Sequence, residues 1–505
     1  MSQPEGVPQP EPMPNLASPH EKLFALPKPE PLRIGFETYL SPYSYRYGSP
    51  EMRETWSQVR FWGNVRKTWN ASNEVKNQIG LVSDEEIADL LAHEGDLSVE
   101  RIYQFERDKN VGTRHDIGAA VAEYNEVATI GGPRSHEAMT SDDALGAAEM
   151  MQIYEAIGII EPKIDENLEA FGETIAKRKD QVCMGFTHLQ LAEPTTVGYR
   201  NAKYAQDLLI DKQFMKYTKT LLKAKGIKGP VGTSAAMEEL LKDTGMTPEE
   251  HEARVMEKLG LQYVTISDQT YPRKMLFLTM ASLASIAQTL HRYTLDLQVL
   301  SSSAYLEVSE YYKKGQIGSS AMPHKKNPIN SENICSLTEA LPGYLVSAWQ
   351  TGANVTLERT LRDSAGKRSW LPEAFLAVDE SLERAKNVTK QLIFRDRVIA
   401  ANLKKYAPFA ATELVMSKMI RSGVDRNLAH SILVEASETA LEAVGAGEPN
   451  PMKDIVLNEP RITDAIGVEE AEACFEEILE HVGNAPRLCE KFLKEELYPA
   501  IGKAA

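Results

Sequence analysis

The chain has 505 residues, 42% of them hydrophobic and 25% charged, and its formal net charge is −16 at pH 7. This length allows two to four domains around a large core, and the composition is ordinary for a globular protein. The acidic balance argues against nucleic acid as a partner, because nucleic-acid-binding surfaces are basic. No run approaches the roughly 18 apolar residues of a membrane span. The N-terminus also lacks a basic segment followed by an apolar one, so we expect neither a membrane span nor a signal peptide.

The four cysteines are scattered without the spacing of a disulfide framework or a metal site; they are Cys183, Cys335, Cys474 and Cys489. We interpret them as reduced thiols of a cytoplasmic protein. No other pattern indicates a metal ion or a cofactor, so we expect neither.

Residues 1–33 form a proline-rich arm. Nine of the 27 prolines lie between Met1 and Pro31, and large apolar side chains are few. This composition favours an extended, disordered segment. The arm is either a tail or a contact with a neighbouring chain.

A first helical domain is expected over residues 34–139. Apolar side chains recur there at spacings of three and four, which is typical of the core face of a helix; they are Met52, Trp56, Val59, Trp62, Val65 and Trp69. Ser83 with Glu86 three positions later predicts a capping box at the start of another helix.

Residues 140–395 indicate a long central helical bundle, with helical stretches at about 142–178, 197–225, 330–340 and 369–392. Residues 272–312 have no internal glycine and no proline after Pro272, and they would span about 60 Å as one helix. This stretch carries two apolar rows: Leu276, Met280, Leu283, Ala287, Leu290 and Leu297, and then Leu278, Ile286, Tyr293 and Leu300. A helix with two apolar faces belongs inside a bundle or between subunits.

Residues 396–505 predict a third, smaller helical domain, punctuated at 445–454 and at Gly467. Period-two alternation is rare along the whole chain. We therefore expect an all-α fold of three helical domains, with at most short strands near the active-site loops.

The stretch from Gly315 to Glu332 is the most informative part of the chain. It reads Gly-Gln-Ile-Gly-Ser-Ser-Ala-Met-Pro-His-Lys-Lys-Asn-Pro-Ile-Asn-Ser-Glu, and no Asp or Glu occurs from Tyr311 to Ser331. Its glycines give the backbone freedom, and Asn327 followed by proline is typical of a helix start. A mobile loop that enters a helix N-terminus beside two lysines suits an anionic ligand.

This string closely resembles the signature loop of the fumarase/aspartase superfamily, and His324 after the proline is similar to the adenylosuccinate lyase family within it. The resemblance runs from about residue 40 to the final helices. It implies a fumarase/aspartase-like fold in which the bundles of four subunits form a homotetramer. It also implies that loops from three chains build each active site.

Two further strings resemble the family segments that hold the substrate. Arg114, His115 and Asp116 resemble its Arg-His-Asp segment, which contacts the nucleotide, although alone they are equally typical of a helix N-terminal turn. His136 precedes Thr140 and Ser141 at the family spacing, which implies that the two hydroxyls bind the substrate carboxylate. Ala138 stands where the family usually carries glycine.

The string around His188, Thr-His-Leu-Gln-Leu-Ala-Glu-Pro-Thr-Thr, resembles the family segment whose histidine is the general acid. Leu191 replaces a frequent proline there. Alone, such a string is also typical of a structural corner.

Several residues resemble family positions that contact the phosphate or the rest of the substrate; they are Arg46, Tyr47, Gln269, Arg359, Ser364 and Arg368. Arginine suits phosphate because its planar fork donates two parallel hydrogen bonds.

The resemblance implies a β-elimination of fumarate from adenylosuccinate, and also from the succinyl-aminoimidazole-carboxamide ribotide. Ser319 would be the base and His188 the acid. The aci-carboxylate intermediate needs fixed positive charge, for which Lys325 and Asn327 are placed. Glu332 would orient a histidine, although a helix-surface carboxylate is the alternative.

Two other functions stay open at this point. One is another lyase of the superfamily, such as carboxymuconate cycloisomerase or argininosuccinate lyase; the nucleotide-directed strings at 114–116 and 359–368 argue against it. The other is a catalytically silent structural relative, which would have lost Ser319 or His188.

Overall fold

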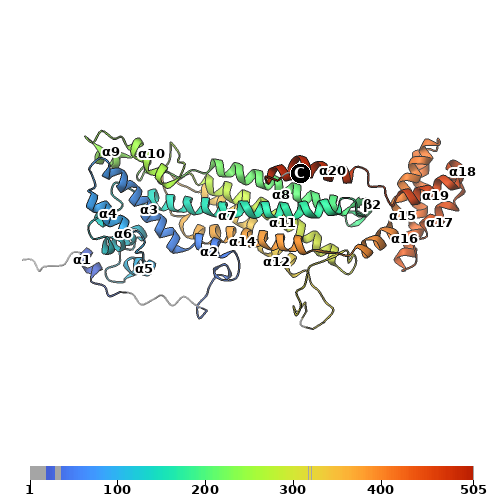
Figure 1. Ribbon diagram of the computed structural model, residues 1–505, viewed down its shortest axis with the longest axis horizontal. Coiled ribbons are helices and arrows are strands. Elements are labelled where there is room, and N and C mark those ends of the chain that lie inside the picture. Colours follow the sequence, from blue (N-terminus) through green and yellow to red (C-terminus); the bar gives the residue numbers. More distant parts are fainter. Residues whose placement is uncertain (1–18, 29–35, 317, 320, 504–505) are drawn as a thin grey trace, which may run out of the picture.

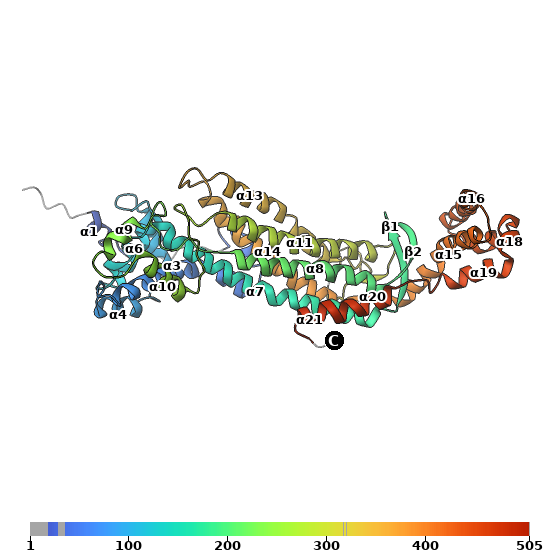
Figure 2. The ribbon, with the colours of Figure 1, turned by 90° about the horizontal axis from the view of Figure 1, so that it is seen from above.

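Long helices run side by side through the middle of an elongated molecule (Figures 1 and 2). The computed structural model describes residues 19–28, 36–316, 318–319 and 321–503. The long central helices are α7 (Ser141–Arg178), α8 (Val197–Leu221), α11 (Lys274–Ser301) and α14 (Ser364–Gln391). The shorter α12 (Ile329–Thr338) and α13 (Leu341–Ala353) pack against α11. The expected central helical bundle is confirmed.

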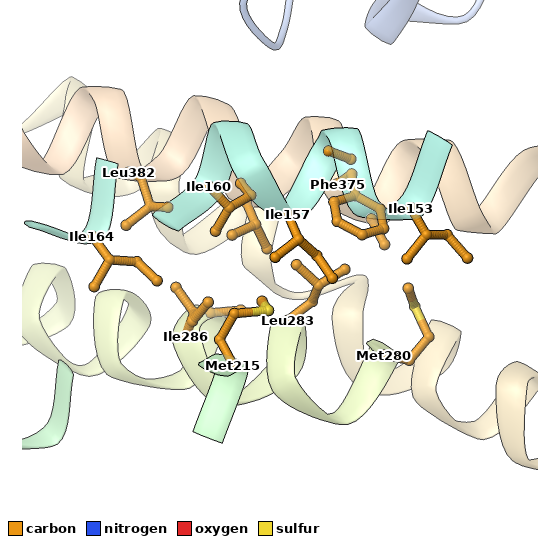
Figure 3. Packing of buried hydrophobic residues seen from close by; sticks show 14 of the residues in the cluster. Ile153, Ile157, Ile160, Ile164, Met215, Met280, Leu283, Ile286, Phe375 and Leu382 are labelled. Atoms are coloured by element: carbon orange, nitrogen blue, oxygen red, sulfur yellow. The ribbon is translucent and has the colours of Figure 1, made fainter. Parts of the chain in front are cut away.

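The centre of the bundle is apolar. Figure 3 shows Ile153, Ile157, Ile160 and Ile164 of α7 among side chains of α8, α11 and α14. These isoleucines are spaced by three and four residues, so they lie on one face of α7, and each is fully buried. Burying one such side chain stabilises the fold by about 1.5–3 kcal/mol. The bundle is therefore a rigid frame for the loops at its two ends.

Helix α11 has the two expected apolar rows but is shorter than predicted. All six residues of the first row are buried, and in the second row only Leu278 is half-buried. The helix ends at Ser301 instead of continuing to Tyr312. Three successive serines favour this end, because their hydroxyls compete for backbone hydrogen bonds.

Strands are few and short, as expected for an all-α fold. β1 (Val182–Thr187) and β2 (Gln190–Thr196) form an antiparallel hairpin just beyond the end of α7. β3 (Val308–Ser309) pairs with β4 (Ile393–Phe394). Among the described residues, no helix is both long and apolar enough to cross a membrane.

The N-terminal helices surround their own apolar cluster at the other end of the bundle (Figure 1). They are α2 (Pro50–Thr55), α3 (Gln58–Asn77), α4 (Asp84–Ala92), α5 (Val99–Arg107) and α6 (Asp116–Val127), with 3₁₀ turns at Pro42–Ser44 and Gly132–Arg134. Helices α9 (Ala235–Leu241) and α10 (Pro248–Leu259) lie beside them, and Ser83 forms the expected capping box. Val59 is 62% exposed, so its assignment to the core is wrong. The apolar period does not continue through Ser57, which caps a new helix.

The described part of the proline-rich arm is packed rather than disordered. Residues 1–18 and 29–33 lie outside the described residues. Between them, α1 (Pro19–Phe24) places Leu23 in the N-terminal apolar cluster, and Arg101 donates a hydrogen bond to the carbonyl group of Leu26. The prediction of disorder is wrong for residues 19–28, because a short apolar run there finds a partner surface.

A separate helical group begins at Asp396. It contains α15 (Asp396–Arg421), α16 (Arg426–Gly445), α17 (Met452–Leu457), α18 (Pro460–Ile466) and α19 (Val468–Glu477), packed around their own apolar cluster. The chain then returns to the bundle (Figure 2), where α20 (Ala485–Phe492), a π-helical turn (Leu493–Leu497) and α21 (Tyr498–Ala500) pack with α7 and α8. The three-domain division stays a prediction. The packing departs from its last boundary, because Cys489 and Leu497 bury their side chains in the bundle core.

Candidate active site

Residues expected to hold the nucleotide gather at the end of the bundle where α7 and α14 begin. Arg368 on α14 donates to Asp116 at the start of α6, with 3.0 Å between Nη2 and Oδ2. Arg359 lies 3.2 Å from the carboxylate of Asp142 on α7. Arg359, Ser364 and Arg368 line one cavity of about 100 Å³ together with Asp142. The structure thus brings together segments that are far apart in the sequence.

A buried group of charges that the sequence analysis did not identify supports Arg359. Arg273 is 1% exposed and contacts Asp142 at 3.3 Å and Asp363 at 2.7 Å. Burial opposes ionisation of Asp363, but Arg273, Lys367 and Arg359 together lower its pKa. The available signal in the sequence was the density of charges around residues 359–368. It did not reveal which of them would be buried.

Thr140 and Ser141 lie at the N-terminus of α7, as the N-cap and first residue. Gln269 donates to the Thr140 hydroxyl, with 3.4 Å between Nε2 and Oγ1. Asp143 accepts from the backbone N–H group of Thr140 at 2.8 Å and lies 2.6 Å from Lys225 Nζ. These contacts place the expected carboxylate-binding hydroxyls beside Gln269 and hold their backbone.

His136 is half-buried beside this segment and is neutral at pH 7. Its Nδ1 accepts from the indole N–H group of Trp69 at 3.2 Å, and burial lowers its pKa to about 4. Ala138 has a φ of 57°, in the left-handed region. Glycine adopts that region without steric cost, so the alanine at this position is strained.

His115 is the N-cap of α6, and its Nδ1 accepts from the backbone N–H group of Gly118 at 3.3 Å. The string therefore forms a helix N-terminal turn, and its contact with the nucleotide stays a prediction. Arg114 donates to the carbonyl groups of Arg107 and Lys109 in its own loop. The His115 side chain is 58% exposed, and its Nδ1 lies 3.7 Å from Oδ1 of Asp116.

Arg46 and Tyr47 lie on a loop that packs against α14. The Gly48 N–H group donates to Glu380 at 3.0 Å. Arg46 is exposed, and its guanidinium lies over the Tyr47 ring, 5.7 Å from the centroid. A cavity of about 340 Å³ lies between the start of this loop and α14, and Arg368 lines it, but Arg46 and Tyr47 are not among its lining residues.

His188 lies elsewhere, at the exposed tip of the β1–β2 hairpin beyond the far end of α7 (Figure 1). Helix α7 has 38 residues, so about 57 Å separate its two ends. Within the described part of the chain, no hydrogen bond or ion pair joins His188 to another predicted site residue. Leu191 pairs with Phe186 in the hairpin, so it is accommodated where the family often has proline.

Ser319, Lys325 and Asn327 lie on the loop that leads into α12. Ser319 Oγ accepts from the backbone N–H groups of Ala321 and Met322 at 3.4 Å and 3.2 Å. Asn327 closes the loop, because its Nδ2 donates to the carbonyl group of Gly318 at 3.2 Å. Lys325 is exposed.

The helix after this loop does not offer its N-terminus to a ligand. It begins at Ile329, so the cap is Pro328 and not the predicted residue before it. The carboxylate of Glu310 accepts from the backbone N–H groups of Asn330 and Ser331, at 3.1 Å and 2.7 Å. The expected anion site at this N-terminus is therefore wrong, because the chain's own carboxylate fills it.

Glu332 is exposed on the first turn of α12. Among the described residues, no hydrogen bond or ion pair connects it with a histidine. The orienting role expected for Glu332 thus has no partner within one chain, and the role stays a prediction.

Comparisons with known proteins identify the family. A model described as "Lyase" matches residues 47–343, and a model described as "Adenylosuccinate lyase C-terminus" matches residues 408–492. An adenylosuccinate lyase of Schistosoma mansoni is 31% identical over 481 residues, which cover 92% of this chain and 96% of the relative. The chain belongs to the adenylosuccinate lyase family.

Other relatives of this family agree. An adenylosuccinate lyase of Saccharomyces cerevisiae is 31% identical, again over 92% of this chain and 96% of the relative. Among solved structures, a fumarate lyase from Mesorhizobium has a TM-score of 0.76 at 19% identity, covering 91% of this chain and 100% of that chain. A 3-carboxy-cis,cis-muconate lactonizing enzyme from Pseudomonas putida has a TM-score of 0.75 at 19% identity, with 90% and 98% covered. These two likenesses establish the fumarase/aspartase-like fold alone.

Proposed function

We propose that the chain cleaves adenylosuccinate into fumarate and AMP. The observation that carries this proposal is the similarity along nearly the whole chain to relatives named adenylosuccinate lyase in eukaryotes, bacteria and archaea. The residues at the start of α7 and α14 support it, because a nucleotide needs both the phosphate-binding arginines and the neighbouring polar groups. We extend the proposal to the succinyl-aminoimidazole-carboxamide ribotide, which carries the same succinyl and phosphate groups.

In the proposed mechanism, Ser319 removes a proton from the carbon beside a substrate carboxylate. The carbon–nitrogen bond then breaks, the carbon–carbon double bond of fumarate forms, and His188 protonates the departing nitrogen. A serine hydroxyl is a base only when ionised, and hydrogen bonds donated to its oxygen favour that form. The two loop N–H groups on Ser319 Oγ supply such bonds, and Lys325 adds positive charge when the loop closes over substrate.

We assign substrate binding to the end of the bundle where α7 and α14 begin. Thr140 and Ser141 would bind the carboxylate, with Gln269 beside them. Arg368 would exchange Asp116 for the substrate phosphate, since its side chain is 62% exposed. Arg368→Ala should then raise KM more than it lowers kcat, because the phosphate is held equally in the ground and transition states. A fall in kcat at constant KM would contradict this role.

We also propose that four chains form a homotetramer and that each site combines loops of three chains. The two ends of α7 lie about 57 Å apart. One chain therefore cannot bring both His188 and Thr140 to one nucleotide, which supports a site shared between chains. Large apolar side chains exposed on the bundle helices provide contact surface; they are Ile210, Tyr217, Leu295, Val346 and Trp349. The four cysteines are free thiols, which supports a cytoplasmic location.

The test is an ultraviolet assay of the purified protein with adenylosuccinate and, separately, with the ribotide. We expect both to be cleaved, and Ser319→Ala to lower kcat by on the order of 10²–10⁴-fold without changing the tetramer. Light scattering measures the mass of the assembly. No cleavage of adenylosuccinate by a folded tetramer would refute the proposed function, and a folded monomer would refute the shared site.

A further inference from the structure

The turn that carries His188 is strained. His188 and Leu189 connect β1 to β2 directly, and their φ angles are 54° and 58°. Two-residue turns of this kind favour Asn-Gly, because a side chain at positive φ costs about 1–2 kcal/mol. Both side chains are exposed, so burial at the tip does not offset the cost. Contacts elsewhere must therefore hold the turn in this form.

The hairpin ladder alone does not hold it. The pairing shifts register between Met184 and Phe186, which marks a bulge, and the ladder partner of Met184 is Pro194. Proline has no N–H group to donate to the ladder. The carbonyl group of Met184 accepts instead from the Nη2 atom of Arg200 on α8. A side chain thus takes the place of a ladder hydrogen bond.

Arg200 is itself fixed by buried partners. Its Nη1 lies 3.1 Å from the carboxylate of Glu307, which is 1% exposed. Glu307 also accepts from Asn402 on α15 at 3.2 Å. The side chain of Arg200 is 13% exposed, and its guanidinium lies over the ring of Phe186 in β1. The planar guanidinium of Arg200 therefore contacts the hairpin and the buried carboxylate of Glu307 at the same time.

A second contact reaches the tip. The Tyr305 hydroxyl donates to the carbonyl group of Leu189 at 3.4 Å. Its ring packs edge-on against Phe186, with 4.9 Å between centroids and an interplanar angle of 80°. Tyr305 follows α11, so the tip is tied to the bundle at the residue next to His188.

We propose that Arg200 and Tyr305 are positioning residues that hold the strained His188 turn in the geometry needed to protonate the leaving nitrogen. The proposal rests on the proposed function, in which His188 is the general acid. Arg200 acts through the Met184 carbonyl and Tyr305 through the Leu189 carbonyl. Neither needs to touch the substrate, because a shift of about 1 Å in a catalytic group can cost up to about 10²-fold in rate.

The test uses Arg200→Lys and Tyr305→Phe in the full-length enzyme. Lysine keeps the charge beside Glu307 but cannot span two acceptors, and phenylalanine keeps the ring but loses the hydroxyl. We expect kcat to fall by about 10-fold in each with KM unchanged, and hydrogen exchange to accelerate at the amides of residues 183–195. The matched controls are Arg461→Lys and Tyr154→Phe. Native Arg461 forms an ion pair in the C-terminal group, and the hydroxyl of native Tyr154 donates to the carbonyl group of Leu222. We expect both controls to keep kcat and hairpin exchange unchanged.

A double-mutant cycle with His188→Gln separates positioning from general stability. If Arg200 and Tyr305 act through His188, their substitution should lower kcat no further once His188 is replaced. Additive losses would overturn the proposal, as would unchanged hairpin exchange in both variants. If His188→Gln leaves kcat intact, the assignment of His188 as the acid and the positioning role of Arg200 and Tyr305 both fail, while cleavage of adenylosuccinate stands. If His188→Gln is inactive but Arg200→Lys and Tyr305→Phe are fully active, only the positioning role fails.

Discussion

Subunit complementation tests whether the two ends of the bundle meet in one site. His188→Ala removes the proposed acid at the hairpin, and Arg368→Ala removes a phosphate contact at the opposite end of α7. Both side chains are largely exposed in the chain, so neither substitution should disturb the core. Each variant alone should be nearly inactive at substrate concentrations well below KM.

The expected recovery follows from counting. When equal amounts are unfolded together and refolded into mixed tetramers, each of the two positions in a site is intact with a probability of one half. If the positions come from different chains, about a quarter of the sites are complete, because a symmetric assembly builds all sites alike. If one chain supplied both, every site would carry one defect and activity would stay at the level of the parents.

The control pair is Arg359→Ala mixed with Arg368→Ala, since these two residues line one cavity in one chain. That mixture should recover nothing. Native mass spectrometry verifies that mixed tetramers have formed, and the ultraviolet assay measures kcat/KM. Mixed His188→Ala and Arg368→Ala tetramers that remain as inactive as their parents would refute the shared-site architecture.

Three further substitutions test the fold around the site. Burial lowers the pKa of His251 to about 4, so the unfolded chain binds a proton at this residue more tightly than the folded chain does. The free energy of unfolding should therefore fall by up to about 3 kcal/mol as the pH drops from about 6.5 to about 4. Urea midpoints at pH 7 and pH 5 should therefore differ less in His251→Gln than in the wild type, and an equal difference would contradict this. Glu310→Gln should lower the unfolding free energy by about 1–3 kcal/mol, because it leaves helix N–H groups without an anion; thermal unfolding should show no change for exposed Glu332→Gln. Ala138→Gly should raise stability by up to about 1 kcal/mol by relieving positive φ, and a loss of stability would mean that the Ala138 methyl group matters more than strain.

Local patterns predicted the helices well where a long apolar period runs without interruption. The buried rows of α11 are an example, since residues three or four apart must share a face of any helix. The same reasoning failed where a short polar signal interrupts the period. Ser57 starts a new helix and exposes Val59, and the serines after Leu300 end α11. Local hydrogen-bonding competition decides such boundaries, and hydrophobic spacing does not detect it.

The family, the all-α fold and the candidate residues could be predicted from the sequence, because these depend on residue types in a fixed order. Which of the candidate residues meet depends on how the helices pack. Thr140, Gln269, Arg359 and Arg368 converge through α7 and α14, while His188 lies at the far end of the same helix. Tertiary packing alone also placed Glu310 at the start of α12 and Arg200 under the hairpin. Contacts of this kind depend on how rigid helices pack, and the local order of residues in the sequence does not predict that geometry.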